Sequence, residues 1–179
     1  GVEVITPNPF SSGSAKWNLL APYAAKSDGG NNPQAGLDYI SKLVSEHVKV
    51  QPKTGREATV TFLQGTGDVL LSYENEALFI EGEGDPVSHV TPPRTFKIEN
   101  PVAVLKGSKN LQAAEAFRDY LYTPAAQKLW VEAGFRPVAE TVAKEFAAKF
   151  PAPSKLWTID DVGGWPAVDK DLFTKDSVR

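Results

Sequence analysis

Ser12, Gly13 and Ser14 have the residue types and the spacing that bind a small anion. They follow a β-branched stretch, residues 2–6, and a proline-rich turn, and Ser12 is a suitable N-cap for a helix over residues 13–25. The first N–H groups of a helix lack intrahelical partners and carry a partial positive charge of roughly half an electron, so they hold an anion without a cationic side chain. The alternative is that the Ser-Gly-Ser sequence only caps the helix.

Two further strand-to-helix junctions are predicted downstream. Thr54 and Glu57 have the spacing of a capping box and follow a short strand over residues 48–50. A buried parallel strand, and a candidate for the centre of a sheet, is predicted over residues 67–73, with a helix that begins at Glu74. Ligands of doubly wound α/β sheets bind at the carboxyl ends of the strands, so we expect the three junctions to converge on one site.

Side chains that catalyse reactions or bind metals are sparse. His47 and His89 are far apart in the sequence and lack a ligand pattern, and cysteine is absent. Arg56 is expected to point its guanidinium either at an anion or only at Glu57 or the helix surface. Glu74 and Glu76 are typical acids of a helix N-terminus rather than a paired general acid and base. We therefore predict no catalytic residue, no metal and no cofactor.

Composition indicates a globular protein of one larger or two small domains. The 179 residues are 41% hydrophobic and carry a net charge of -3 without a dense basic cluster, so nucleic acid and anionic membranes are not expected partners. No apolar run approaches the ~18 residues of a membrane span, and the start shows no signal-peptide pattern. Methionine is absent even at position 1, which indicates processing or a fragment of a longer protein.

The remaining segments are mostly helical. A helix over 34–47, a short strand over 87–91, and an extended crossing over 94–105 are predicted. Three more helices follow, over residues 111–122, 124–134 and 139–150.

Motifs along the whole chain are similar to those of one transport family. The Pro-Asn-Pro, Ser-Gly and Trp17 combination, followed by Glu-Asn-Glu-Ala at 74–77, is the most specific. The segments 122–127 and 134–137 are shared by many two-domain binding proteins, and residues 156–165 extend the match. Together these motifs resemble the periplasmic sulfate-binding proteins of bacterial sulfate/thiosulfate ABC importers.

The resemblance implies an α/β fold with two lobes and doubly wound mixed sheets, the Venus-flytrap form of type II periplasmic binding proteins. Residues 1–96 would then form most of the second lobe, with the anion site, and residues 97–179 the hinge return and the C-terminal helical part of the first lobe. An N-terminal part of the first lobe would precede this chain and supply further ligands. The C-terminal helices are accordingly expected to expose an apolar face.

The resemblance also implies a ligand set for a dehydrated sulfate. Ser12 would donate its hydroxyl, and Gly13, Ser14 and Gly55 their backbone N–H groups. Tyr73 falls where the family uses a tryptophan indole N–H, and Ser14 stands where glycine is usual. A site with only hydrogen-bond donors would accept sulfate, which has no proton near neutral pH, and penalise protonated phosphate.

The function that the resemblance implies is capture of sulfate or thiosulfate and delivery to the permease subunits of an ABC transporter. The protein would be a monomer, periplasmic or extracytoplasmic, secreted or lipid-anchored to the cell envelope, and not an enzyme. Tyr73 and Ser14 leave open another tetrahedral oxyanion, such as molybdate or phosphate. Two other classes remain as alternatives: an α/β transferase or phosphatase that uses the same anion cradle, and an interaction protein that has lost its ligand site.

Overall fold

The computed structural model describes residues 1–174, which form two compact units. Among the described residues, unit 1 contains 1–76, 90–97 and 153–174, and unit 2 contains 77–89 and 98–152. Residues of the 153–174 segment pack with the rest of unit 1 through a strand pair and a helix. How the two units correspond to the lobes of a longer protein stays a prediction.

The first sheet of unit 1 has three parallel strands. β1 (Val4–Ile5) is central and pairs with β2 (Val48–Val50) and β3 (Val69–Leu70). The prediction that the 67–73 strand is central is therefore wrong: β3 lies at an edge, and the Val69 side chain is 41% exposed. All described strand pairs are parallel, so the mixed character of the expected sheets is not represented within residues 1–174.

Each strand of this sheet runs into a helix, as predicted. α1 (Gly13–Ser27) follows β1, α3 (Gly55–Leu63) follows β2, and α4 (Glu74–Gly82) follows β3. Because the strands are parallel, their carboxyl ends lie at one edge of the sheet, and the three helices begin beside that edge. The α/β class predicted from the sequence is confirmed.

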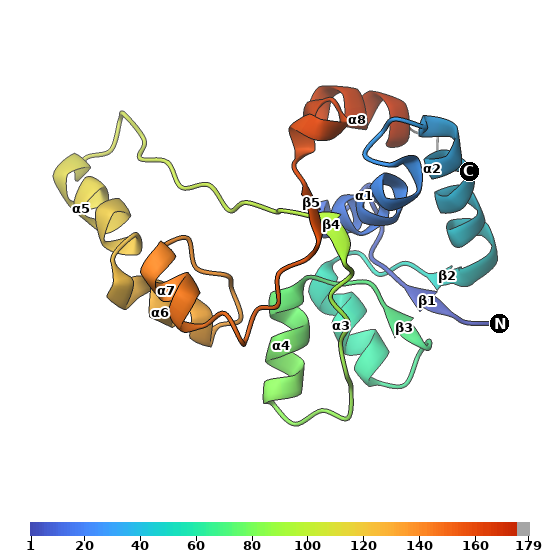
Figure 1. The fold of residues 1–179 in the computed structure, drawn as a ribbon, viewed down its shortest axis with the longest axis horizontal. Coiled ribbons are helices and arrows are strands. Elements are labelled where there is room, and N and C mark those ends of the chain that lie inside the picture. Colours follow the sequence, from blue (N-terminus) through green and yellow to red (C-terminus); the bar gives the residue numbers. More distant parts are fainter. Residues whose placement is uncertain (175–179) are drawn as a thin grey trace. The chain divides into compact units, whose positions relative to one another are not determined.

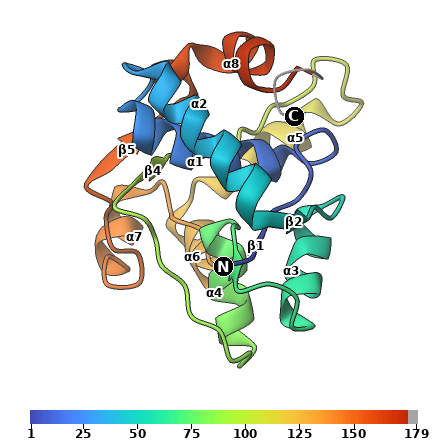
Figure 2. The same ribbon diagram turned by 90° about the vertical axis from the view of Figure 1, so that its right-hand side faces the viewer.

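The core of unit 1 is built around α1. Its buried Leu19 and Leu20 pack with residues of α2 (Pro33–Lys42), of the parallel pair β4 (Arg94–Phe96) and β5 (Lys155–Trp157), and of α8 (Gly164–Leu172). Figures 1 and 2 show α2 and α8 next to α1. A 3-10 helix, Ile159–Val162, precedes α8.

The structure differs from the predicted elements in two further places. The helix predicted over 34–47 ends at Lys42 and continues as a π-helix over Leu43–His47, which leads into β2. No strand forms over residues 87–91, because this segment is held instead by side-chain contacts such as the bond from His89 N to Glu81 Oε1.

A close approach of α1 and α2 depends on Gly36. A methyl group at this position would lie 2.5 Å from the ring of Tyr23, whose side chain is buried. We expect Gly36→Ala to destabilise the protein, because an overpacking cost of about 1–3 kcal/mol exceeds the gain of up to about 1 kcal/mol that alanine has over glycine in a helix. Urea unfolding measures the difference. Gly82→Ala in α4 is the matched control, since nothing lies within 4 Å of its added methyl group, and equal stability of the two variants would contradict the packing explanation.

Unit 2 is helical in its described residues. It contains α5 (Leu111–Leu121), α6 (Pro124–Glu132) and α7 (Glu140–Glu145) around a small core of Val131, Val142 and Phe150. α7 is shorter than the predicted 139–150 helix, because residues 147–149 turn so that Phe150 reaches this core. Large hydrophobic side chains of this unit are exposed, among them Phe117, Tyr120, Tyr122 and Leu129. That they form the apolar face expected of the C-terminal helices stays a prediction.

Candidate anion-binding site

The starts of α1, α3 and α4 surround one cavity, which we name the helix-start cavity. Its volume is about 250 Å³. Ser14 and Gly55 are close neighbours in its lining, since a methyl group on Gly55 would lie 3.1 Å from Ser14 Oγ. The lining residues are Pro7, Ser14, Asn18, Gly55, Arg56, Leu71, Ser72, Tyr73, Asn75 and Glu76. The predicted convergence of three junctions is therefore what the structure shows.

Backbone donors are available at this edge. In the described part of the chain, the N–H groups of Gly13, Ser14 and Gly55 donate to no acceptor. Thr54, by contrast, caps α3 as predicted, because its hydroxyl accepts from the N–H of Glu57 at 3.1 Å. The unused N–H groups are those that the resemblance assigns to the anion, and their ligand role stays a prediction.

Ser12 does not cap α1 with its side chain. The residue has the extended backbone of an N-cap (φ -134°, ψ 125°), but its hydroxyl bonds to Ser14 Oγ at 2.8 Å. One hydroxyl hydrogen is used between the two oxygens, which leaves a second O–H to donate elsewhere. Ser14 therefore links the predicted hydroxyl ligand, Ser12, to the helix-start cavity.

Tyr73 lies in the wall of the helix-start cavity and is half-buried. Burial raises the pKa of its phenol above the ordinary value of 10.0. The O–H consequently stays protonated, and able to donate, throughout the neutral and mildly alkaline range. This is the protonation state that a substitute for an indole N–H requires.

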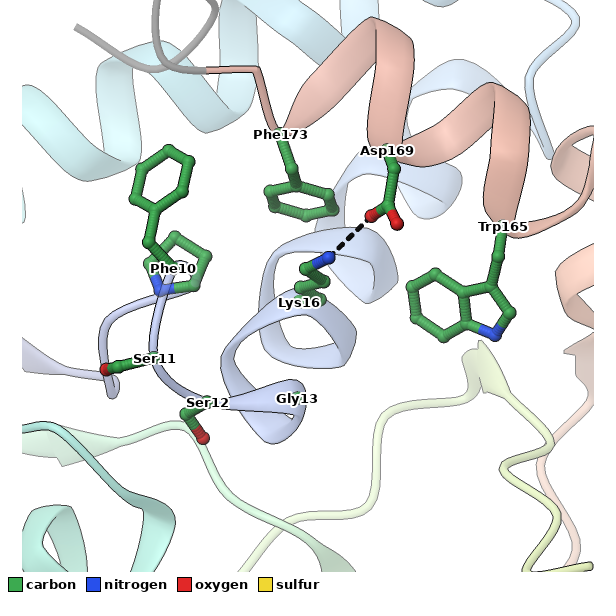
Figure 3. Close-up of a pocket in the computed structure, with 9 residues that line it drawn as sticks. Phe10, Ser11, Ser12, Gly13, Lys16, Trp165, Asp169 and Phe173 are labelled. Atoms are coloured by element: carbon green, nitrogen blue, oxygen red, sulfur yellow. Dashed lines mark hydrogen bonds and ion pairs between the residues drawn. The ribbon is translucent and has the colours of Figure 1, made fainter.

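Ser12 and Gly13, two of the predicted ligands, line a second, open depression instead of the helix-start cavity. We name this depression the aromatic hollow. It has a volume of about 460 Å³, and Trp165 of α8 and Phe173, which follows α8, flank it, as Figure 3 shows. Lys16 crosses its floor and donates to Asp169 Oδ1 at 2.6 Å. The Lys16 ammonium lies 5.8 Å from the Trp165 ring and 5.3 Å from the Phe173 ring. Its position four residues, one helical turn, after Ser12 is the sequence signal that could have found it.

Arg56 forms an ion pair that the sequence did not indicate. Its Nη2 lies 3.0 Å from Glu76 Oε1 on α4, so a carboxylate of the same cavity is neutralised. This partner is neither a neighbour on α3 nor a bound anion. The cationic side chains of both cavities, Lys16 and Arg56, are thus each paired with a carboxylate. The groups that remain to attract an anion are therefore the backbone N–H groups at the helix starts and the hydroxyls.

Asn18 is a supporting residue that sequence reasoning missed. It is buried, and its amide donates to Thr6 Oγ1 at 3.1 Å and to the carbonyl of Leu71 at 2.8 Å. These bonds tie α1 to the ends of β1 and β3 and so position the cavity walls. A polar residue one turn after Ser14 on an otherwise apolar helix face is the signal that marked it.

The histidines take no part in either cavity. His47 Nδ1 lies 2.9 Å from the carbonyl of Val2, and His89 Nδ1 lies 2.9 Å from both carboxylate oxygens of Glu81. Both are surface hydrogen-bonded residues, as predicted. Within residues 1–174, no group of three or more potential ligands is placed to hold a metal ion, and no helix has the length and apolar character needed to cross a bilayer.

Residues 1–136 of the chain match one known protein family. The family model described as bacterial extracellular solute-binding protein matches residues 1–136, which is more than half of the chain. The chain belongs to this family. In this solute-binding protein the matched region includes the start of all three helices of the helix-start cavity.

Individual relatives agree with the family. The solute-binding chain is 41% identical over 181 residues to the sulfate-binding protein of Salmonella typhimurium, a match that covers 97% of the chain and 55% of the relative. It is 35% identical over 186 residues to the thiosulfate-binding protein of Escherichia coli, with 97% and 53% covered. The structure is similar to that of the sulfate-binding protein SubI from Mycobacterium tuberculosis H37Rv, with a TM-score of 0.90, 66% identity, and 97% and 61% of the two chains covered. The chain spans about half the length of the curated relatives it matches.

Proposed function

We propose that the protein containing this chain is an extracytoplasmic solute-binding protein that captures sulfate or thiosulfate. The observation that carries the proposal is the set of backbone N–H groups at Gly13, Ser14 and Gly55, which have no acceptor among the described residues. Ser14 and Gly55 line the helix-start cavity, and Gly13, the residue before Ser14, lines the aromatic hollow. Hydrogen bonds to a charged group contribute roughly 1.5–3 kcal/mol each, so several of them offset the dehydration of a dianion.

The relatives support this choice of anion. Proteins named for sulfate and for thiosulfate binding both match nearly the whole chain at 35–41% identity. Delivery of the anion to membrane permease subunits of an ABC importer is part of the proposal, as is a periplasmic or cell-envelope location, free or lipid-anchored. A monomeric binding protein without an enzymatic role is the expected form.

Calorimetric titration of the full natural polypeptide with sulfate, thiosulfate, phosphate and molybdate tests the proposal. We expect tight binding of sulfate or thiosulfate and weak binding of phosphate. Binding of only molybdate or phosphate would change the assigned substrate but retain the assignment of an anion site. If none of the four anions binds, the result contradicts the proposal and favours an interaction protein that has lost its ligand site.

A further inference from the structure

Glu76 places a negative charge in the wall of the helix-start cavity. Its side chain is 18% exposed, and it shares the cavity with Ser14 and Gly55, two of the predicted anion ligands. A carboxylate at such a place repels a dianion and offers an acceptor to any oxyanion that still carries a proton. Without a partner for its charge, Glu76 would weaken the binding of sulfate and favour the binding of protonated phosphate.

Both carboxylate oxygens of Glu76 have partners on α3. Oε1 lies 3.0 Å from Arg56 Nη2, and Oε2 lies 3.3 Å from the hydroxyl of the buried Thr59. These partners stand one position and four positions after Gly55, on the helix whose first residue lines the cavity. The helix that begins at the cavity therefore supplies a partner for each oxygen of the carboxylate.

We propose that Arg56 and Glu76 form a neutral pair that sets the oxyanion selectivity of the site. Arg56 cancels the charge of Glu76 and occupies one of its oxygens, so that only donors face the anion. Arg56 acts through Glu76 and is a positioning residue rather than a ligand. The inference rests on the proposed function, since it concerns the selectivity of that same site.

A double-mutant cycle tests the pair in the full natural polypeptide, with sulfate and inorganic phosphate as probes. We expect Arg56→Gln to weaken sulfate binding about five- to tenfold and phosphate binding less, because the exposed carboxylate accepts a hydrogen bond from protonated phosphate. The sulfate-to-phosphate affinity ratio falls accordingly. Arg56→Gln combined with Glu76→Gln is expected to return sulfate affinity to within about threefold of the wild type, because the repelling charge is gone.

The outcomes separate this inference from its rivals. If the double variant binds sulfate as weakly as Arg56→Gln does, Arg56 is a direct ligand and the proposal is overturned. If the sulfate-to-phosphate affinity ratio is unchanged in Arg56→Gln, the pair is only a surface ion pair and does not set selectivity. Should Arg56→Gln not fold, Glu76→Gln alone carries the test, and weaker sulfate binding in it contradicts the proposal.

Lys42→Gln is the control for loss of one positive charge, since this exposed α2 residue lines neither cavity. Failure of the wild type to bind sulfate would reject the proposed function instead.

Discussion

Gly55→Pro is expected to weaken sulfate binding by about 10- to 100-fold, because it deletes one charge-assisted backbone hydrogen bond. Gly55 is the first residue of α3, where a missing N–H leaves no intrahelical bond unmade and the fixed φ of proline suits the helix. Thr54 precedes it with φ -131° and ψ 161°, the extended backbone that a residue before proline prefers. The fold is therefore expected to tolerate the change, and the loss should appear in binding.

Gly55→Ala is the matched control. It retains the N–H and adds only the methyl group, which would lie 3.1 Å from Ser14 Oγ and require a shift of a few tenths of an ångström. Calorimetric titration of both variants with sulfate, together with thermal unfolding of each, separates loss of the donor from crowding. Equal weakening in the alanine and proline variants would assign the effect to crowding at Ser14, and unchanged affinity in the proline variant would remove Gly55 from the site.

The local signals of the sequence were reliable where structure depends on neighbouring residues. Thr54 and Glu57 predicted the start of α3 from a capping pattern, and the hydroxyl of Thr54 does accept from the N–H of Glu57. The convergence of three helix starts followed from parallel strands alone, whose carboxyl ends share an edge. Prediction of this kind needs only short-range chemistry and a topological rule.

The partner that a particular side chain chooses was not predictable in the same way. Ser12 has the backbone of an N-cap, yet its hydroxyl bonds to Ser14, because two hydroxyls separated by one residue compete with the helix N–H groups. Glu76 has the ordinary signature of a helix N-terminal acid, and only the packing of α4 beside α3 pairs it with Arg56. The return of α8 to α1, through Lys16 and Asp169, joins residues 153 positions apart. No pattern in a single sequence specifies such a pairing.

Tyr73→Phe is expected to weaken sulfate binding by about tenfold or more, because it removes the phenol O–H and leaves the ring in place. The ring is half-buried in the wall of the helix-start cavity, so the loss of one oxygen changes little of its packing. Burial raises the pKa of the phenol above 10.0, which keeps the donor protonated. We therefore expect the contribution of the Tyr73 phenol to the sulfate affinity of the wild type to stay constant as the pH rises from 6 to about 9.

Tyr73→Trp completes the test. The resemblance places an indole N–H at this position, and an indole donates but does not accept, so we expect the variant to hold sulfate as tightly as the wild type or more tightly. The two substitutions also separate the anions, because a phenol oxygen can accept a hydrogen bond from protonated phosphate whereas an indole cannot. Phosphate binding should therefore fall relative to sulfate in Tyr73→Trp. Calorimetry with both anions measures the ratio, and an unchanged affinity for sulfate in Tyr73→Phe would show that the phenol lies beside the anion without binding it.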